Sequence, residues 1–278
     1  MKDTQGALNP LVEAGGLTGG SHATQQRLLE MMGLFAARLA VLAALIGAWQ
    51  LVVIFNLADR IVTGTPREVG AYLWEAVQSR ELWINLAATM QATVIAFALA
   101  SVVGIVVGVS LGLLPKVEKI IDPFLSTFNA MPRIALAPIF IVAFGLTMTA
   151  KVAVAFTIVI FIMIVSARAG VRSVDNDIMR LSYVLGASRR QLFAKVLIPT
   201  AIPSIFGGLR LAVIYSLLGV VTAELIGSTD GMGQLLQDAL AQFQINRMYG
   251  LLIVLAVVAS LMNMAMGFLE RHLLRWQP

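Results

Sequence analysis

The sequence has no cysteine, and histidine occurs only at His22 and His272, near opposite ends of the chain. The missing cysteine excludes disulfides, thiolate metal sites and cysteine nucleophiles, and two distant histidines argue against a histidine metal site within one chain. No lysine is followed by serine or threonine, so the chain has no G-x4-G-K-[ST] phosphate loop. H-E-x-x-H, a serine nucleophile elbow and a convergent carboxylate cluster are also missing, which argues against an enzyme.

Charge is scarce as well. Charged residues make up 13% of the 278 residues, hydrophobic residues make up 59%, and the mean hydropathy is +0.86. A soluble domain carries roughly 25% charged residues, so the surplus apolar surface needs lipid as its solvent. The net charge of +5 is not interleaved with aromatic residues. It therefore fits loops at a membrane face and argues against nucleic-acid binding.

Six apolar segments are long enough to cross a bilayer, which predicts an all-α polytopic membrane protein with about six transmembrane helices. They cover residues 34–57, 86–114, 120–145, 151–171, 202–226 and 249–268. Residues 1–26 lack an apolar period and are expected to form a flexible cytoplasmic tail before a membrane domain of residues 27–278. Lysine and arginine favour the loops on one side, which predicts that both termini are cytoplasmic.

Small residues recur every four positions along the second segment, at Ala100, Gly104, Gly108 and Gly112. Such a ridge lets another helix approach closely, either from the same chain or from a second copy. The third segment is interrupted instead, by Pro123, Pro132 and Pro138. Proline inside a span is tolerated where the backbone is covered by protein or lines a cavity. This segment is expected either to line a pathway or to be a kinked packing helix.

The longest break in the apolar pattern of the C-terminal half runs over residues 177–199, which is also the most basic stretch. Gly186 permits a positive φ and predicts an elbow between two short helices. Ser188 followed by Gln191 fits a capping box, and Pro199 is expected to mark the turn into the next span. The loop either follows the ordinary positive-inside bias or forms a contact surface.

Gly186, Val196, Ile198 and Pro199 resemble the G-x9-I-x-L-P core of the loop signature of binding-protein-dependent ABC importer permeases, and residues 168–212 resemble the nitrate/sulfonate/taurine branch. The family usually has Glu-Ala-Ala before the glycine, whereas this chain has Arg180-Leu181-Ser182. The resemblance covers roughly residues 80–278 and implies a type I ABC importer-like fold. It also implies that the loop 173–199 docks on a separate ATPase. The implied coupling residues are Leu185, Gly186, Ala187, Ser188, Arg189, Arg190, Gln191, Leu192, Phe193 and Pro199.

Residues 131–140 resemble a recurrent segment of the third helix in this family. The implied translocation path contains Asn129, Met131, Arg133, Thr222 and Glu224. A charge inside the membrane is costly, so Glu224 is expected either to sit in a gate or to pair with a structural partner such as an arginine. Arg210 is expected to face protein or water, or to extend its head group to the cytoplasmic end.

Residues 228–247 lie between the last two spans and are expected to form an external helix. Its apolar stripe consists of Leu235, Leu236, Ala239, Leu240 and Phe243. Helical spacing of these side chains predicts one apolar face. That face is expected either to receive a binding protein or to pack on the rim of the bundle.

The resemblance therefore implies a non-enzymatic permease subunit in the bacterial inner (cell) membrane, surrounded by lipid. It implies two permease copies, two ATPase subunits that bind ATP and Mg, and a periplasmic or extracellular substrate-binding protein. The permease itself is expected to bind no cofactor, metal or nucleic acid. The solute is expected to be a small anion such as a sulfonate, nitrate or taurine. The alternatives are an ion-coupled secondary transporter, for which Glu224 is the candidate site, and a membrane scaffold without transport.

Overall fold

The computed structural model describes residues 19–57, 59 and 63–274, and all regular structure in these residues is helical. The chain divides into two units, Met1–Pro66 and Arg67–Pro278. The first unit contains helix α1 (Gly19–Ile54). Its apolar stretch Met32–Ile54 buries none of its residues within the protein and is long enough to span a membrane. The helix begins within the expected tail of residues 1–26; residues 1–18 lie outside the described part of the chain.

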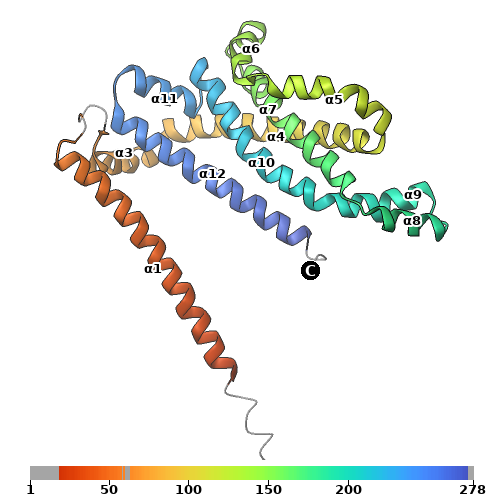
Figure 1. Cartoon of the computed structure of the whole chain (residues 1–278). Helices are drawn as coiled ribbons and strands as arrows, with labels where there is room; N and C mark the ends of the chain where they lie inside the picture. The colour runs from red at the N-terminus through yellow and green to blue at the C-terminus, as the bar shows by residue number, and fades with distance from the viewer. Residues whose placement is uncertain (1–18, 58, 60–62, 275–278) are drawn as a thin grey trace, which may run out of the picture. The chain divides into compact units, whose positions relative to one another are not determined.

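The second unit is a helical bundle (Figure 1). Its elements are α3 (Pro66–Gln78), α4 (Arg80–Leu113), α5 (Pro115–Ala130), η1 (Arg133–Leu136), α6 (Ala137–Phe144), α7 (Met148–Arg172), α8 (Asn176–Val184), α9 (Arg189–Leu192), η2 (Phe193–Leu197), α10 (Ile198–Ile226), α11 (Met232–Ala241) and α12 (Ile245–Leu273). Helix α7 packs against both α4 and α10 and forms the centre of the bundle. Buried alanine, valine and methionine side chains fill the space between these three helices.

Five helices in the described residues are long and apolar enough to cross a membrane, and six spans result if the bent pair α5 and η1–α6 counts as one. The two arms of that pair are bent by 80°. The break falls at Met131 and Pro132, where α5 ends and the 3-10 helix η1 begins. The expected interruption of the third segment is confirmed, since proline cannot continue a regular helical hydrogen-bond ladder.

The small-residue ridge of α4 packs against α7 of the same chain, which decides between the two expected partners. A Cβ atom on Gly104 would lie 2.5 Å from Met163 Cβ, and one on Gly108 would lie 2.5 Å from the Ile164 carbonyl oxygen. Such distances leave no room for a side chain. The close approach of the two backbones therefore depends on these glycines, as in other packed membrane helices.

The loop between α7 and α10 has the expected elbow. Gly186 lies between α8 and α9 with φ of +74°, and the Ser188–Gln191 capping box is present. The prediction for Pro199 is wrong, because helical residues continue without a break from Arg189 to Ile226. The π turn η2 precedes Pro199, and the Ile198 N–H donates to the Phe193 carbonyl across it. The wider turn accommodates a proline that has no N–H and would otherwise collide with the preceding turn.

The segment that is expected to be external contains helix α11, which packs on the bundle as one of the two expected arrangements. Its buried side chains include Met232, Leu235, Leu236 and Ala239, and they meet residues of α3, α4, α10 and α12. Leu240 and Phe243 of the same apolar stripe remain exposed, at 55% and 76%. Docking of a binding protein on this surface stays a prediction.

Candidate functional site

A cavity of about 360 Å³ lies beside the break in the third segment, between η1, α7 and α10. It is lined by Met131, Arg133, Ile134, Ile158, Tyr215, Leu218, Gly219 and Thr222. Three of the expected path residues therefore lie together: Met131, Arg133 and Thr222. On the α10 side, Tyr215, Gly219 and Thr222 share one face because they are spaced by one helical turn each.

Arg133 is held at the edge of this cavity by neutral oxygen atoms. Its Nη1 donates to the Ile158 carbonyl at 3.0 Å, and its Nη2 donates to the Asn129 carbonyl at 2.9 Å and also to the Asn129 side chain. The guanidinium lies over the Phe161 ring, 4.5 Å from its centroid. The expected path residue Asn129 thus positions Arg133 and is not part of the cavity lining.

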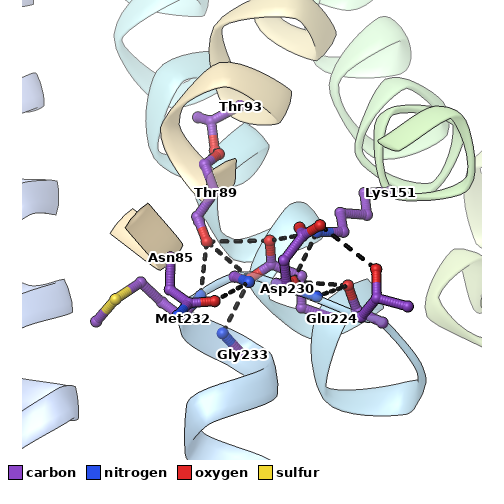
Figure 2. Close-up of polar contacts among 11 residues, drawn as sticks. Asn85, Thr89, Thr93, Lys151, Glu224, Asp230, Met232 and Gly233 are labelled. Carbon is purple, nitrogen blue, oxygen red and sulfur yellow. Dashed lines mark hydrogen bonds and ion pairs between the residues drawn. The ribbon is translucent and has the colours of Figure 1, made fainter. Parts of the chain in front are cut away.

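Glu224 does not line the cavity. Its side chain is fully buried and belongs to the outer cluster, which consists of Asn85, Thr89, Lys151, Glu224 and Asp230 (Figure 2). Lys151 Nζ lies 3.2 Å from Glu224 Oε1 and donates to the Asp230 carbonyl at 2.7 Å. The Thr89 hydroxyl donates to Glu224 Oε2 at 2.8 Å. Of the two expectations for Glu224, the structural pairing is the one observed, with lysine in place of arginine.

The outer cluster also caps α11. The N–H groups of Gly231, Met232 and Gly233 donate to Asn85 Oδ1, Thr89 Oγ1 and Glu224 Oε2 at 2.7, 2.8 and 2.9 Å. The first N–H groups of a helix have no partner within the helix, so these side chains supply the missing acceptors. Helices α4, α7 and α10 are thereby joined to α11 by one set of buried polar contacts. Lys151 was not among the predicted site residues, because it stands at the very start of the expected span 151–171.

A second set of ion pairs, the inner cluster, consists of Glu118, Asp122, Arg168 and Arg172. Glu118 is buried, with its Oε1 3.3 Å from Arg168 Nη1 and its other oxygen paired with Arg172. Arg168 also pairs with Asp122. These contacts fasten α5 to the end of α7. Nothing in the local sequence identifies the acidic partners of the two arginines, since Arg168 follows Asp122 by 46 positions and Arg172 follows Glu118 by 54.

Arg210 contacts the neighbouring helix rather than extending along its own. Its Nε donates to Asn263 Oδ1 at 3.1 Å, and its Nη1 lies 3.7 Å from Glu270 Oε2. Both partners belong to α12, so the expectation that Arg210 faces protein is confirmed. Half of the side chain remains exposed.

The loop around Gly186 presents an apolar face that sequence analysis only partly identified. Ile178, Leu181, Val184 and Leu185 are between 51% and 83% exposed. The spacing of these residues puts them on one side of α8 and at the elbow. Among the expected coupling residues, Leu192 is buried, whereas Leu185, Arg189, Arg190 and Phe193 are accessible. The signal for Ile178, Leu181 and Val184 was present as apolar spacing within a polar stretch.

A cavity of about 600 Å³ lies under this loop and is lined by the ends of α4 and α7 and by α8, α9 and η2. Arg189 and Phe193 contribute to its lining, together with Arg172 of the inner cluster. Part of the loop is therefore separated from the ends of α4 and α7 by this cavity. This arrangement leaves room for α8 and the elbow to shift relative to α7.

Comparison with known proteins identifies relatives of most of this chain. Residues 100–277 match the model of the family described as "Binding-protein-dependent transport system inner membrane component". The chain is 30% identical to the putative aliphatic sulfonates transport permease protein SsuC of Bacillus subtilis, over 84% of this chain and 85% of that protein. It is 33% identical to the riboflavin transport system permease protein RibX of Chloroflexus aurantiacus, over 82% and 85%. A chain of the MetNI methionine ABC transporter in an inward-facing conformation shares the fold, with a TM-score of 0.57 at 19% identity over 69% of this chain and 94% of that chain.

Proposed function

Because this chain belongs to the family of binding-protein-dependent transport system inner membrane components, we propose that two copies of it form an import pathway for a small organic anion of the aliphatic sulfonate class. The chain is a multi-pass permease subunit of an ABC importer and not an enzyme, and ATP is hydrolysed on a separate subunit. The family implies an ATPase and a substrate-binding protein as partners. In the proposed assembly each copy receives one ATPase carrying ATP and Mg, and both termini of the chain are cytoplasmic.

The observation that supports ATPase docking most directly is the exposed apolar face of the α8 loop. Leu181, Val184 and Leu185 are 59%, 83% and 75% exposed, although the loop is otherwise polar and basic. Exposed apolar patches rimmed by polar residues mark protein interaction sites. Arg189 and Arg190 stand on the other side of the elbow, where they are available for acidic groups of the partner.

A continuous helical run connects this loop to the outer surface. The run from Arg189 to Ile226 has 38 residues, which corresponds to about 57 Å at the helical rise. It passes the cavity at Tyr215 and Thr222 and reaches the outer cluster at Glu224. When ATP draws the two ATPase subunits together, a shift of the loop is expected to tilt this helix and alter both regions. Differential contact of the loop with the two ATPase states supplies the energy.

On the opposite side of the membrane, α11 is the proposed contact for the substrate-binding protein. Leu240 and Phe243 are exposed there, while the N-terminus of the helix is fixed by the outer cluster. A partner that presses on α11 therefore acts on α4 and α10 through Thr89 and Glu224. This arrangement gives the delivery of solute a physical connection to the helices that line the cavity.

Affinity purification of the tagged chain from its host membranes in a mild detergent tests the proposed function. The wild type is expected to retain an ATPase subunit in equal amount, as measured by quantitative mass spectrometry. Leu181→Asp combined with Leu185→Asp is expected to lose it, because charge replaces the apolar contact face. Leu240→Asp is the matched control, with a similarly exposed leucine at the opposite end of the bundle. Recovery of the wild-type chain without an ATPase in several detergents contradicts the proposal.

A further inference from the structure

Among the residues that the structure describes, Arg133 has no anionic partner. Its hydrogen-bond acceptors are the carbonyls of Ile158 and Asn129 and the Asn129 side-chain oxygen, all of them neutral. Asp122, the closest acid along the chain, is paired with Arg168 instead. The Nε–H of Arg133 is buried and has no hydrogen-bond acceptor among the described residues. The positive charge therefore lacks compensation within the described part of the protein.

This cation lies at the break in a candidate membrane span. The bent pair formed by α5 and η1–α6 is long and apolar enough to count as one span. An ionisable residue at such a position is expensive, and it is typically found facing a substrate pathway or a specific partner. Neutral carbonyls and the Phe161 ring stabilise the guanidinium, but they leave its net charge unchanged.

The cavity beside Arg133 has the character of a ligand site. Its volume of about 360 Å³ falls in the range of ligand pockets, which run from roughly 300 to 1,000 Å³. Ile134, Ile158 and Leu218 supply apolar wall, and Tyr215 and Thr222 are the hydroxyl-bearing residues of the α10 side; the Thr222 hydroxyl donates to the Leu218 carbonyl at 2.7 Å. A mostly apolar cavity with a few polar groups and one unpaired guanidinium is suited to an amphiphilic anion.

We propose that Arg133 and this cavity form an anion-binding site inside the permease, which accepts the sulfonate group of the transported solute while the apolar walls contact its alkyl part. The inference rests on the proposed import function and identifies Arg133 as the group that binds the charged end of the solute. Arg133 suits a sulfonate because its charge is permanent, and its Nη1 uses only one of its two N–H groups, on the Ile158 carbonyl, so the other can donate a charge-assisted hydrogen bond to the anion. A neutral solute would leave the charge of the half-buried Arg133 uncompensated. The site therefore discriminates against neutral solutes of the same size.

Binding of trifluoromethanesulfonate, followed by ¹⁹F NMR line broadening, tests this site in the full chain in lipid nanodiscs. Wild type is expected to bind saturably. Arg133→Gln is expected to bind at least about tenfold more weakly, because a charge-assisted hydrogen bond contributes about 1.5 to 3 kcal/mol and 1.4 kcal/mol corresponds to a factor of ten. Arg133→Lys retains the charge and is expected to stay within about threefold of wild type. Arg210→Gln, which removes an arginine paired with Glu270 outside the cavity, is the matched control.

A second pair of variants keeps the test decisive if Arg133→Gln does not fold. Leu218→Glu places a carboxylate on the cavity wall and is expected to weaken binding at least about tenfold by neutralising Arg133, whereas Leu218→Gln is expected to have little effect. Leu218 is 53% exposed, and Leu218→Gln controls for the cost of placing a polar side chain in the span. The neutral probe trifluoroethanol is expected to respond equally to wild type and to each variant.

Equal binding of trifluoromethanesulfonate by wild type, Arg133→Gln and Leu218→Glu overturns the inference, and so does the absence of saturable binding by wild type. Retention of the ATPase subunit, measured on the same preparations, separates this inference from the proposed function. A chain that retains the ATPase but binds the probe independently of Arg133 remains an importer subunit without this site. If the chain binds the probe through Arg133 but purifies without an ATPase subunit, the anion-binding site is supported and the proposed import function is contradicted.

Discussion

Replacing Lys151 by methionine is expected to destabilise the protein by about 3 to 5 kcal/mol, the usual cost of removing one partner of a buried ion pair. Lys151 is 3% exposed and Glu224 is fully buried. Their charged atoms lie 3.2 Å apart, which corresponds to an attraction of roughly 5 kcal/mol at an effective dielectric constant of about 20. Without the ammonium, Glu224 keeps the Thr89 hydroxyl and the Gly233 N–H but loses its counter-charge.

The second variant in this experiment neutralises both partners. Glu224→Gln keeps the shape of the side chain and an oxygen that accepts from Thr89 and Gly233. In Lys151→Met combined with Glu224→Gln, no buried charge is left alone, so the loss is expected to be smaller than the sum of the two single losses. The difference, which is the interaction energy of the pair, is expected to be about 2 to 3 kcal/mol.

Unfolding by sodium dodecyl sulfate in mixed micelles, followed by circular dichroism, measures these free energies. Lys116→Met is the control, because Lys116 is exposed at the start of α5 and a surface substitution changes stability by about 0.5 kcal/mol or less. A cost below about 1 kcal/mol for Lys151→Met contradicts the assignment of a buried pair. Additivity of the single variants within about 0.5 kcal/mol contradicts it as well.

Two further substitutions probe the helix contacts. Gly108→Leu is expected to destabilise the bundle by at least about 2 kcal/mol, because even its Cβ would lie 2.5 Å from the Ile164 carbonyl oxygen, and the same unfolding assay measures the loss. Glu118→Gln is expected to cost about 1.5 kcal/mol, because Arg168 and Arg172 lose the carboxylate that they share while Arg168 keeps Asp122; protease resistance of the α5–α7 region checks this change.

Each of these two predictions has its own contradicting result. Ser110→Leu is the control for Gly108→Leu, since Ser110 is exposed on the same helix. Equal stability of the two leucine variants contradicts close packing at Gly108. For Glu118, an unchanged protease pattern at low ionic strength shows that the inner cluster does not fasten α5 to α7.

Features set by neighbouring residues could be predicted from the sequence. The apolar runs gave the spans because the length of a membrane helix follows from the thickness of the bilayer. Gly186 and the pair Ser188 and Gln191 predicted the elbow and its cap, since both depend on residues within one helical turn. The ridge from Ala100 to Gly112 predicted a close helix contact because helical periodicity alone puts small side chains on one face.

Features set by the packing of distant segments could not be predicted in the same way. Lys151 and Glu224 are 73 positions apart, and no local sequence pattern predicts their contact. The prediction of a turn at Pro199 was wrong because a proline usually ends a helix, whereas the π turn before Pro199 lets this helix continue. For Arg133, the sequence indicated a charge in a broken span. Its neutral partners and its cavity emerged only once α5, α7 and α10 were packed together.

The most direct test of the account is whether the elbow couples the ATPase to transport. ATP-driven uptake of labelled ethanesulfonate in host membrane vesicles is compared for wild type, Gly186→Val and Gly207→Val. A Cβ meets no atom within 4 Å at either glycine, but Gly186 alone of the two has a positive φ, of +74°, where a β-branched residue is strained. The account predicts normal uptake for Gly207→Val and lost uptake for Gly186→Val at equal membrane insertion. Normal uptake by Gly186→Val would contradict it.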